Sequence, residues 1–228
     1  MNSERPIPKG RTPILLLLAI AKGAMADPRY RHRRFQKHRE AWVLGHFSEL
    51  YNVFPGRVSL FSSAELGDSE AIPADFAIFS ADGAWVCDIE VTELTDVWDW
   101  WREAEGWSEI PEVENPWARL PRLLQQKYAK AARYRDPTWL VVYDNECSDL
   151  YKMLEGVNFG AAEFGHSVIR RMGFGVSSIG NVWILSSDGR AAARIFPDTQ
   201  LLGQCPGAID EVTADELPRD VRRLLGME

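Results

Sequence analysis

The stretch Pro73–Leu94, PADFAIFSADGAWVCDIEVTEL, constrains the fold more than any other part of the sequence. Two apolar runs flank Asp82-Gly83, a pair that is favoured in two-residue type I′ turns between antiparallel strands. The sequence therefore predicts a β-hairpin in which the numbers of facing residues add up to 165. In that register Asp75 lies opposite Glu90.

Alternation of side chains gives this hairpin one apolar face and one acidic face. The apolar face is a core face and consists of Phe76, Ile78, Trp85, Cys87, Ile89 and Val91. The other face carries Asp75, Asp88, Glu90 and Thr92. Opposed Cβ atoms of an antiparallel pair lie about 4.5–5.5 Å apart, so two facing carboxylates repel each other unless a proton or a cation lies between them. The alternative is an acidic edge that faces solvent.

A long helix is expected next, over residues 117–135, and the apolar run TWLVVYD after it is typical of a buried parallel strand. Helical spacing places Lys127 at the centre of an apolar stripe, with Gln126 and Lys130 to one side. A buried ammonium group requires anionic partners. Because this helix connects two strands and packs on their sheet, we expect Lys127 to reach Asp75 and Glu90. In the alternative interpretation the lysine covers apolar surface and keeps its ammonium in water.

The helix expected over residues 35–51 contributes a further candidate acid, Glu40. This residue shares a helix face with apolar residues three, four, seven and eleven positions later: Val43, Leu44, Phe47 and Tyr51. Glu49 competes for the same role, and a plain surface position is the alternative interpretation for Glu40.

An acid that opens a strand, a hairpin, an acid on the second strand and a helix with a lysine together resemble the PD-(D/E)XK nuclease superfamily. The matching residues are Asp75 after PA, Glu90 in CDIEVTEL and Lys127 in RLPRLLQQKYAKAARY. The family pattern has a lysine two residues after the second acid, where this chain has Thr92. The chain is similar to divergent members in which the lysine has moved to the following helix.

This resemblance covers about residues 40–144 and implies an α/β fold. The expected architecture is a restriction-endonuclease-like mixed sheet flanked by helices, here with an N-terminal helical extension. The implied activity is hydrolysis of phosphodiester bonds in nucleic acid with Mg²⁺ or Mn²⁺. Carboxylates hold such ions, and a lysine stabilises the negative charge that develops on the phosphate.

In this interpretation the catalytic residues are Asp75, Glu90 and Lys127, and the metal ligands are Asp75, Glu90 and Glu40. The accessory positions are Asp88, which could bind a second metal, and Thr92, Gln126 and Lys130. One alternative function is a catalytically inactive protein of the same fold that binds a protein or a nucleic acid. Another is a different hydrolase with a carboxylate pair, such as a glycosidase.

The length of 228 residues predicts a single domain. We divide it into an N-terminal helical extension (1–34), a core with the site (35–144), and C-terminal helices with a hairpin (145–228). The apolar run Pro13–Ala21 is too short to cross a bilayer and predicts a buried helix rather than a secretory signal. Three scattered cysteines without a CxxC motif favour a reducing, cytoplasmic location.

Charge is distributed unevenly along the chain, whose formal net charge is -7. Residues 1–50 contain ten Lys and Arg against four Asp and Glu. The run RYRHRRFQKHR in this part is the predicted nucleic-acid contact, through Arg31, Arg33, Arg34 and Lys37. A solvated helix start is the alternative. The Trp-rich segment 96–117 is acidic and predicts a protein partner or a lid, because its charges would repel a phosphate backbone.

Overall fold

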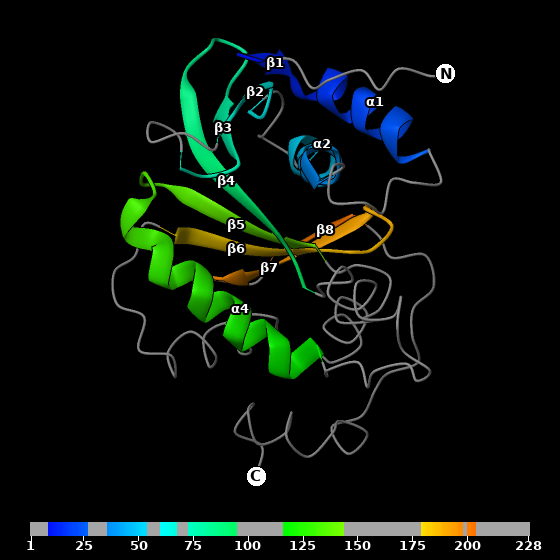
Figure 1. Cartoon of the computed structure of the whole chain (residues 1–228). Helices are drawn as coiled ribbons and strands as arrows, with labels where there is room; N and C mark the ends of the chain where they lie inside the picture. The colour runs from blue at the N-terminus through cyan, green and yellow to red at the C-terminus, as the bar shows by residue number, and fades with distance from the viewer. Residues whose placement is uncertain are drawn as a thin grey trace, which may run out of the picture.

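The computed structural model of the chain describes residues 9–26, 36–53, 60–67, 73–94, 116–143, 179–197 and 200–203 (Figure 1). Their helices are α1 (Ile14–Met25), α2 (Gln36–Val53) and α4 (Pro116–Lys130), and the short 3-10 helix η2 (Ala131–Arg133). Their strands are β1 (Thr12–Pro13), β2 (Ser63–Leu66), β3 (Phe76–Phe79), β4 (Trp85–Glu93), β5 (Thr138–Tyr143), β6 (Ile179–Leu185), β7 (Ala191–Phe196) and β8 (Gln200–Gly203).

These strands form one eight-stranded sheet whose spatial order follows the chain from β1 to β8. Successive strands from β1 to β4 are antiparallel, β4, β5 and β6 are parallel, and β7 and β8 are again antiparallel to their neighbours. A parallel pair requires a crossover connection, which α4 supplies between β4 and β5. The architecture is therefore a mixed α/β sheet flanked by helices, as the sequence predicts.

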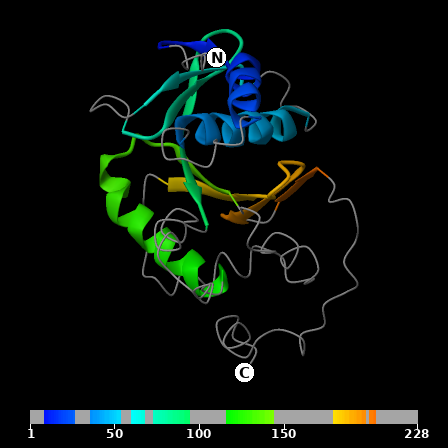
Figure 2. The same cartoon turned by 45° about the vertical axis from the view of Figure 1, so that its right-hand side comes forward.

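Helices cover both faces of this sheet. In Figures 1 and 2, α1 and α2 lie on one face and α4 lies on the other. The core beneath α2 is aromatic: the ring of Tyr51 stacks on Phe61 with centroids 4.7 Å apart and meets Trp139 edge-on at 5.1 Å. Cys87 and Ile89 of β4 belong to the same core, so the apolar residues of this strand point toward α2 as predicted.

The β3–β4 hairpin closes through a three-residue loop instead of the predicted two-residue turn. The N–H of Gly83 donates to the carbonyl of Ser80, and Gly83 has a φ of 85°, the pattern of a turn that ends in a bulge. Phe79 therefore faces Trp85, and Trp85 is exposed, not in the core as expected. A register shift directly afterwards restores the predicted pairing over residues 76–78.

The run RVSLFSS, residues 57–63, is also typical of a strand, but of its described residues 60–63 only Ser63 belongs to one. β2 starts at Ser63, and Phe61 lies before it. The side-chain amide of Asn52 receives a hydrogen bond of 3.0 Å from the Phe61 N–H and donates one of 2.8 Å to the Phe61 carbonyl. A side chain thus satisfies the backbone of Phe61, which therefore needs no neighbouring strand there.

Parts of the chain before and after the expected core belong to the same sheet. β1 pairs with β2 at one edge, and the predicted C-terminal hairpin forms β6 and β7, with β6 paired to β5. The predicted C-terminal helices lie outside the described residues. In the part of the chain that is described, no helix is both long and apolar enough to cross a bilayer.

Gly45 sets how closely α1 approaches α2. A Cβ atom at Gly45 would lie 2.6 Å from the Cβ of Leu18, whereas one at Gly23, on the exposed side of α1, would meet nothing within 4 Å. We expect Gly45→Ala to lower the free energy of unfolding by about 1–3 kcal/mol, the usual cost of overpacking. The matched control Gly23→Ala should raise it by roughly 0.5–1 kcal/mol through helix propensity. Urea denaturation measures both changes, and a Gly45→Ala variant as stable as the control would contradict the close packing.

Candidate functional site

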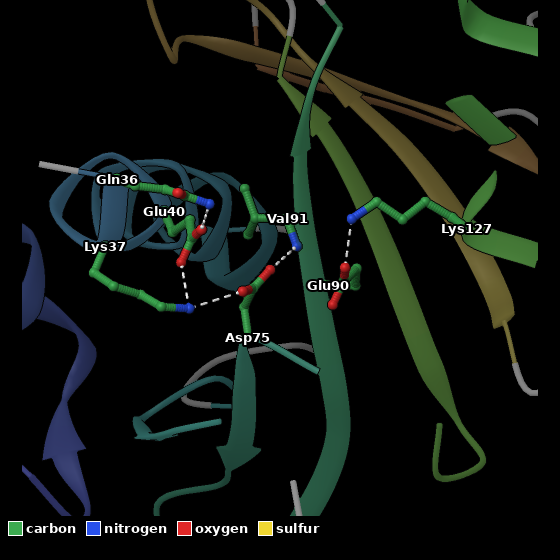
Figure 3. Close-up of polar contacts among 7 residues, drawn as sticks. All are labelled: Gln36, Lys37, Glu40, Asp75, Glu90, Val91 and Lys127. Atoms are coloured by element: carbon green, nitrogen blue, oxygen red, sulfur yellow. Dashed lines mark hydrogen bonds and ion pairs between the residues drawn. The ribbon is translucent and has the colours of Figure 1, made fainter. Parts of the chain in front are cut away.

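Asp75 lies immediately before β3, and its carboxylate continues the backbone pairing beyond the end of that strand. Oδ2 of Asp75 accepts a hydrogen bond of 2.8 Å from the Val91 N–H of β4, and Oδ1 accepts one of 3.0 Å from Lys37 Nζ (Figure 3). A buried backbone N–H requires an acceptor, and at Val91 no residue of β3 is left to provide one. The sheet itself therefore fixes the position of Asp75.

Glu40 approaches Asp75 from α2, where Lys37 and Gln36 precede it at helical spacing. Lys37 Nζ lies 2.8 Å from Oε2 of Glu40, so this ammonium group bridges the carboxylates of Glu40 and Asp75. Gln36 Nε2 donates to Oε1 of Glu40 at 2.9 Å. Oε2 of Glu40 is buried, and the Lys37 ammonium group is its charged partner.

Glu90 lies within β4 and meets the helix on the other face. Lys127 Nζ of α4 donates to Oε1 of Glu90 at 2.5 Å, and the hydroxyl of Tyr134 also bonds to Glu90. Burial, followed by the charge of Glu90, raises the pKa of Tyr134, so this hydroxyl stays protonated and acts as the donor. The sequence predicts that Lys127 reaches Asp75 and Glu90. The structure shows the contact with Glu90, whereas the ammonium group beside Asp75 is that of Lys37.

β4 separates the partners of the two hairpin acids. Figure 3 shows Asp75 turned toward α2 and Glu90 turned toward Lys127. Strict alternation predicts both carboxylates on one face of the sheet. Asp75 lies one residue outside β3, however, so its side chain follows the hydrogen bond to Val91 instead of the pleat. The predicted placement of both carboxylates on one face of the sheet is therefore wrong, because Asp75 contacts α2 and Glu90 contacts α4.

Glu40, Asp75 and Glu90, which we call the acid cluster, form one electrostatic group. Burial raises the pKa of Glu40 to about 8, the negative charge of Asp75 adds to that shift, and Lys37 opposes it. Burial also raises the pKa of Glu90, again with Asp75 adding and Lys127 opposing. Three carboxylates thus face two ammonium groups, which leaves one negative charge uncompensated. The raised pKa of Glu40 lets the cluster retain a proton near neutral pH.

Asp88 belongs to a separate ion pair. It is 0% exposed, and Arg135 binds both of its oxygens, with Nε 2.7 Å from Oδ2. The indole N–H of Trp85 donates to Oδ1 at 3.0 Å. Both oxygens of Asp88 thus hold charged or polar partners, and the described structure gives no support for its expected accessory role at a second metal. Asp88 instead fixes the guanidinium of Arg135 over the Trp85 ring.

The other predicted accessory residues stand apart from the acid cluster. Gln126 and Lys130 are exposed on α4. Thr92 is half-buried on β4, two residues after Glu90, where the family pattern has its lysine. None of the three has a polar contact with the acid cluster in the described structure. On α4, the residue that contacts Glu90 is Lys127.

Among the residues predicted to contact nucleic acid, Lys37 pairs with Glu40 and Asp75 of the acid cluster. Arg31, Arg33 and Arg34 lie outside the described residues. The Trp-rich segment 96–117 lies outside them too, apart from the α4 backbone at its end. Sequence reasoning missed the contact of Lys37 with two acids, although Lys37 stands three residues before Glu40. It also missed Tyr134 as a donor to Glu90, because the helical spacing of Tyr134 places it in the same apolar stripe as Leu120 and Leu124.

Within the described ranges, no group of three or more His, Cys, Asp and Glu side chains is arranged so that it could hold a metal ion. Ammonium groups stand beside the acids instead. Comparison of the chain with protein-family models, with curated proteins and with solved structures finds no match. The chemistry of this site is therefore the basis on which a function can be proposed.

The raised pKa of Glu40 predicts a pH-dependent stability in metal-free buffer. Folding favours the protonated acid, so the contribution of Glu40 to stability is complete below pH 4.5 and is lost as the pH rises to about 8. We expect Glu40→Gln, which mimics the protonated acid, to match the original chain at pH 5. At pH 8.5 it should be more stable by about 2–4 kcal/mol, at roughly 1.4 kcal/mol per unit of pKa shift.

Glu49→Gln is the matched control for this experiment, because Glu49 lies on the same helix with its side chain 45% exposed. Chemical denaturation at pH 5 and pH 8.5 gives the free energy of unfolding of each variant. A stability difference for Glu40→Gln that stays constant between the two pH values would show that Glu40 ionises at its ordinary pKa.

Proposed function

We propose that this chain is a nuclease that hydrolyses phosphodiester bonds of nucleic acid with Mg²⁺ or Mn²⁺. The observation that carries the proposal is that three buried carboxylates flank β4, Glu40 and Asp75 on the α2 side and Glu90 on the α4 side, with Lys37 and Lys127 beside them. Burying a charged side chain costs free energy that even a good ion pair often does not repay. Buried ion pairs therefore add little to the stability of a fold. A catalytic role explains why the chain carries them.

The donor set suits a hard divalent cation. Glu40, Asp75 and Glu90 offer carboxylate oxygens and Val91 offers a carbonyl oxygen, the ligand types that Mg²⁺ and Mn²⁺ prefer. A cation already stands between two of the acids, since Lys37 Nζ lies within 3.0 Å of both carboxylates. These features fit a metal held chiefly by Asp75 and Glu40, with Glu90 on the other side of β4.

The side chains of the protein have distinct tasks in this proposal. A bound ion supplies charge neutralisation at the phosphate and a more acidic water. Lys127 stabilises the negative charge that develops on the phosphate, as the moved lysine of the family would. Glu90 and Tyr134 hold Lys127 in place, because Glu90 accepts hydrogen bonds from both.

The fold is compatible with this assignment. An antiparallel hairpin, a crossover helix and a parallel strand are the elements that the restriction-endonuclease-like fold implies, and we assign the chain to that fold and to the PD-(D/E)XK superfamily. Nucleic acid is then the substrate, and the basic run around Lys37 is the part of the chain that would attract its phosphates.

A second candidate function is that of a catalytically inactive protein with the same fold, which binds a protein or a nucleic acid. One observation favours it: each lysine of the site is already paired with an acid, and Thr92 stands where the family pattern has its lysine. In that case the ion pairs would be permanent and no metal would enter.

The two functions are separated by cleavage assays on single- and double-stranded DNA and RNA. We expect cleavage with Mg²⁺ or Mn²⁺, none with EDTA, and none by Glu90→Gln, which keeps the side-chain shape. Lys127→Ala should lower the rate about 100-fold, the usual effect of removing one electrostatic donor, while metal affinity stays similar. Lys130→Ala, an exposed lysine on the same helix, is the matched control and should cleave like the original chain.

An absence of cleavage with every substrate and both metals would overturn the nuclease proposal in favour of the binding protein. Cleavage that survives in Glu90→Gln would also contradict it, because the activity would then come from another site or from a contaminant. Circular dichroism of each variant establishes that it is folded.

A further inference from the structure

Asp88 is the buried acid that has no task in the proposed function. Its side chain is 0% exposed, yet it bonds to two residues at the surface. It accepts a hydrogen bond of 3.0 Å from the indole N–H of Trp85 and binds Arg135 through both oxygens. Arg135 in turn lies over the Trp85 ring, with its guanidinium carbon 4.8 Å from the ring centroid. A buried charge thus holds a planar cation and a large aromatic ring in one fixed arrangement.

A second pair of an arginine and an aromatic ring lies on the neighbouring strand. Phe79 of β3 is the register partner of Trp85, and the guanidinium carbon of Arg11 lies 3.6 Å from the centroid of the Phe79 ring. Arg11 also donates a hydrogen bond of 3.3 Å to the carbonyl of Gly83 in the hairpin loop. Register partners in an antiparallel pair share one face of the sheet. We call Arg11, Phe79, Trp85 and Arg135 the arginine–aromatic strip.

The strip is open to solvent at Trp85 and Arg135. Phe79 is buried, whereas Trp85 is 36% exposed and the side chain of Arg135 is 41% exposed. The indole N–H and two guanidinium nitrogens already bond to Asp88, so the pair offers chiefly flat surface to a ligand. Aromatic rings and guanidinium groups of this kind stack on other planar groups.

We infer that Trp85 and Arg135 form a stacking platform for an unpaired base, so that the substrate of the proposed nuclease is single-stranded nucleic acid. This inference rests on the proposed function and names the substrate class of the same site. Bases stack on tryptophan rings and on the planes of arginine guanidinium groups. A base inside a duplex has both faces covered by its neighbours, so the platform selects nucleotides that are not stacked in a duplex.

Charge at the strip favours contact with bases over contact with phosphates. The hydrogen bond to Asp88, together with the charges of Asp88 and Glu65, raises the pKa of Arg135, so acids of the protein already balance this guanidinium. The other exposed charges of the strip and its sequence neighbours cancel: Arg11 and Arg133 against Asp82 and Asp136. A surface with balanced charge attracts the phosphate backbone of a duplex only weakly. Stacking, which is available to every base, is the interaction that the strip can supply.

The platform lies on the same face of β4 as Glu90 and its partner Lys127. Asp88 and Glu90 are two residues apart on this strand, so their side chains share a face. Trp85 precedes Glu90 by five residues, about 17 Å along an extended strand. A single strand that runs along this face can therefore stack a base on Trp85 while a phosphate a few nucleotides away reaches Lys127.

The test is fluorescence anisotropy with labelled oligonucleotides in EDTA, which measures binding without cleavage. We expect the full chain to bind single-stranded DNA or RNA more tightly than the duplex of the same sequence. Trp85→Ala should weaken single-strand binding about 10-fold, the usual effect of removing one stacked base. Trp85→Phe, which keeps an aromatic ring, should weaken it much less. Both variants lose the hydrogen bond to Asp88, so a role limited to holding Asp88 would affect them equally.

Salt dependence provides a second measurement. Trp85→Ala removes a stacking contact and no charge, so it should raise the Kd by the same factor at low and at moderate salt. Val53→Ala changes another exposed apolar residue, at the end of α2, and is the matched control that should leave the Kd unchanged. Circular dichroism and the Tm of each variant establish that it is folded.

Unchanged binding by Trp85→Ala, or equal weakening by Trp85→Ala and Trp85→Phe, would overturn the inference. A loss that disappears at higher salt would also overturn it, because the variant would then act through charge. Cleavage of duplexes without single-strand binding in EDTA would overturn the inference and leave the proposed nuclease function standing. An absence of both binding and cleavage would overturn both, and would leave the strip as a surface for a protein partner.

Discussion

The hydrogen bond from the Val91 N–H to Asp75 is the contact on which the site depends. It forms where the β3–β4 ladder runs out of backbone partners, so a side chain completes the sheet and is held in its plane. From that position Asp75 faces α2, where Lys37 and Glu40 meet it. Without this hydrogen bond, Asp75 would no longer be fixed at the position from which its charge acts on both Glu40 and Glu90.

The sheet determines which charged residues surround this hydrogen bond. α2 and α4 lie on opposite faces (Figure 1). Lys37 of α2 pairs with Asp75 just before β3, and Lys127 of α4 pairs with Glu90 of β4 (Figure 3). Arg39 of α2 also pairs with Glu93 near the end of β4, at 3.2 Å, so α2 is tied to this strand by charge as well as by its apolar face. The combination of three acids and two lysines is thus an outcome of the architecture, because three elements contribute the acids and two helices contribute the lysines.

Much of this arrangement can be read from the sequence, and the reasons are physical. The alternation of apolar residues fixed which side of β4 faces the core, and the position of Lys127 in an apolar stripe required an anionic partner. The predicted register is right over residues 76–78 although the turn is not the predicted one, because the extra loop residue and the later register shift cancel. That cancellation depends on hydrogen bonds around Gly83 that no residue pattern specifies.

Other features depend on contacts between distant segments and were beyond sequence reasoning. The bridge made by Lys37 requires the position of α2 relative to Asp75, which helix periodicity does not give. Burial of Asp88 by Arg135 likewise depends on where α4 ends and β5 begins. Asn52 replaces a strand partner of Phe61, a substitution that only the fold reveals.

The central claim is that the acid cluster holds a divalent cation. A crystal of the full chain soaked in Mn²⁺ tests it most directly, because the anomalous scattering of manganese locates the ion. The account predicts an anomalous peak in contact with Glu40 and Asp75. A peak elsewhere, or none, with Lys37 still bridging the two carboxylates, would contradict it.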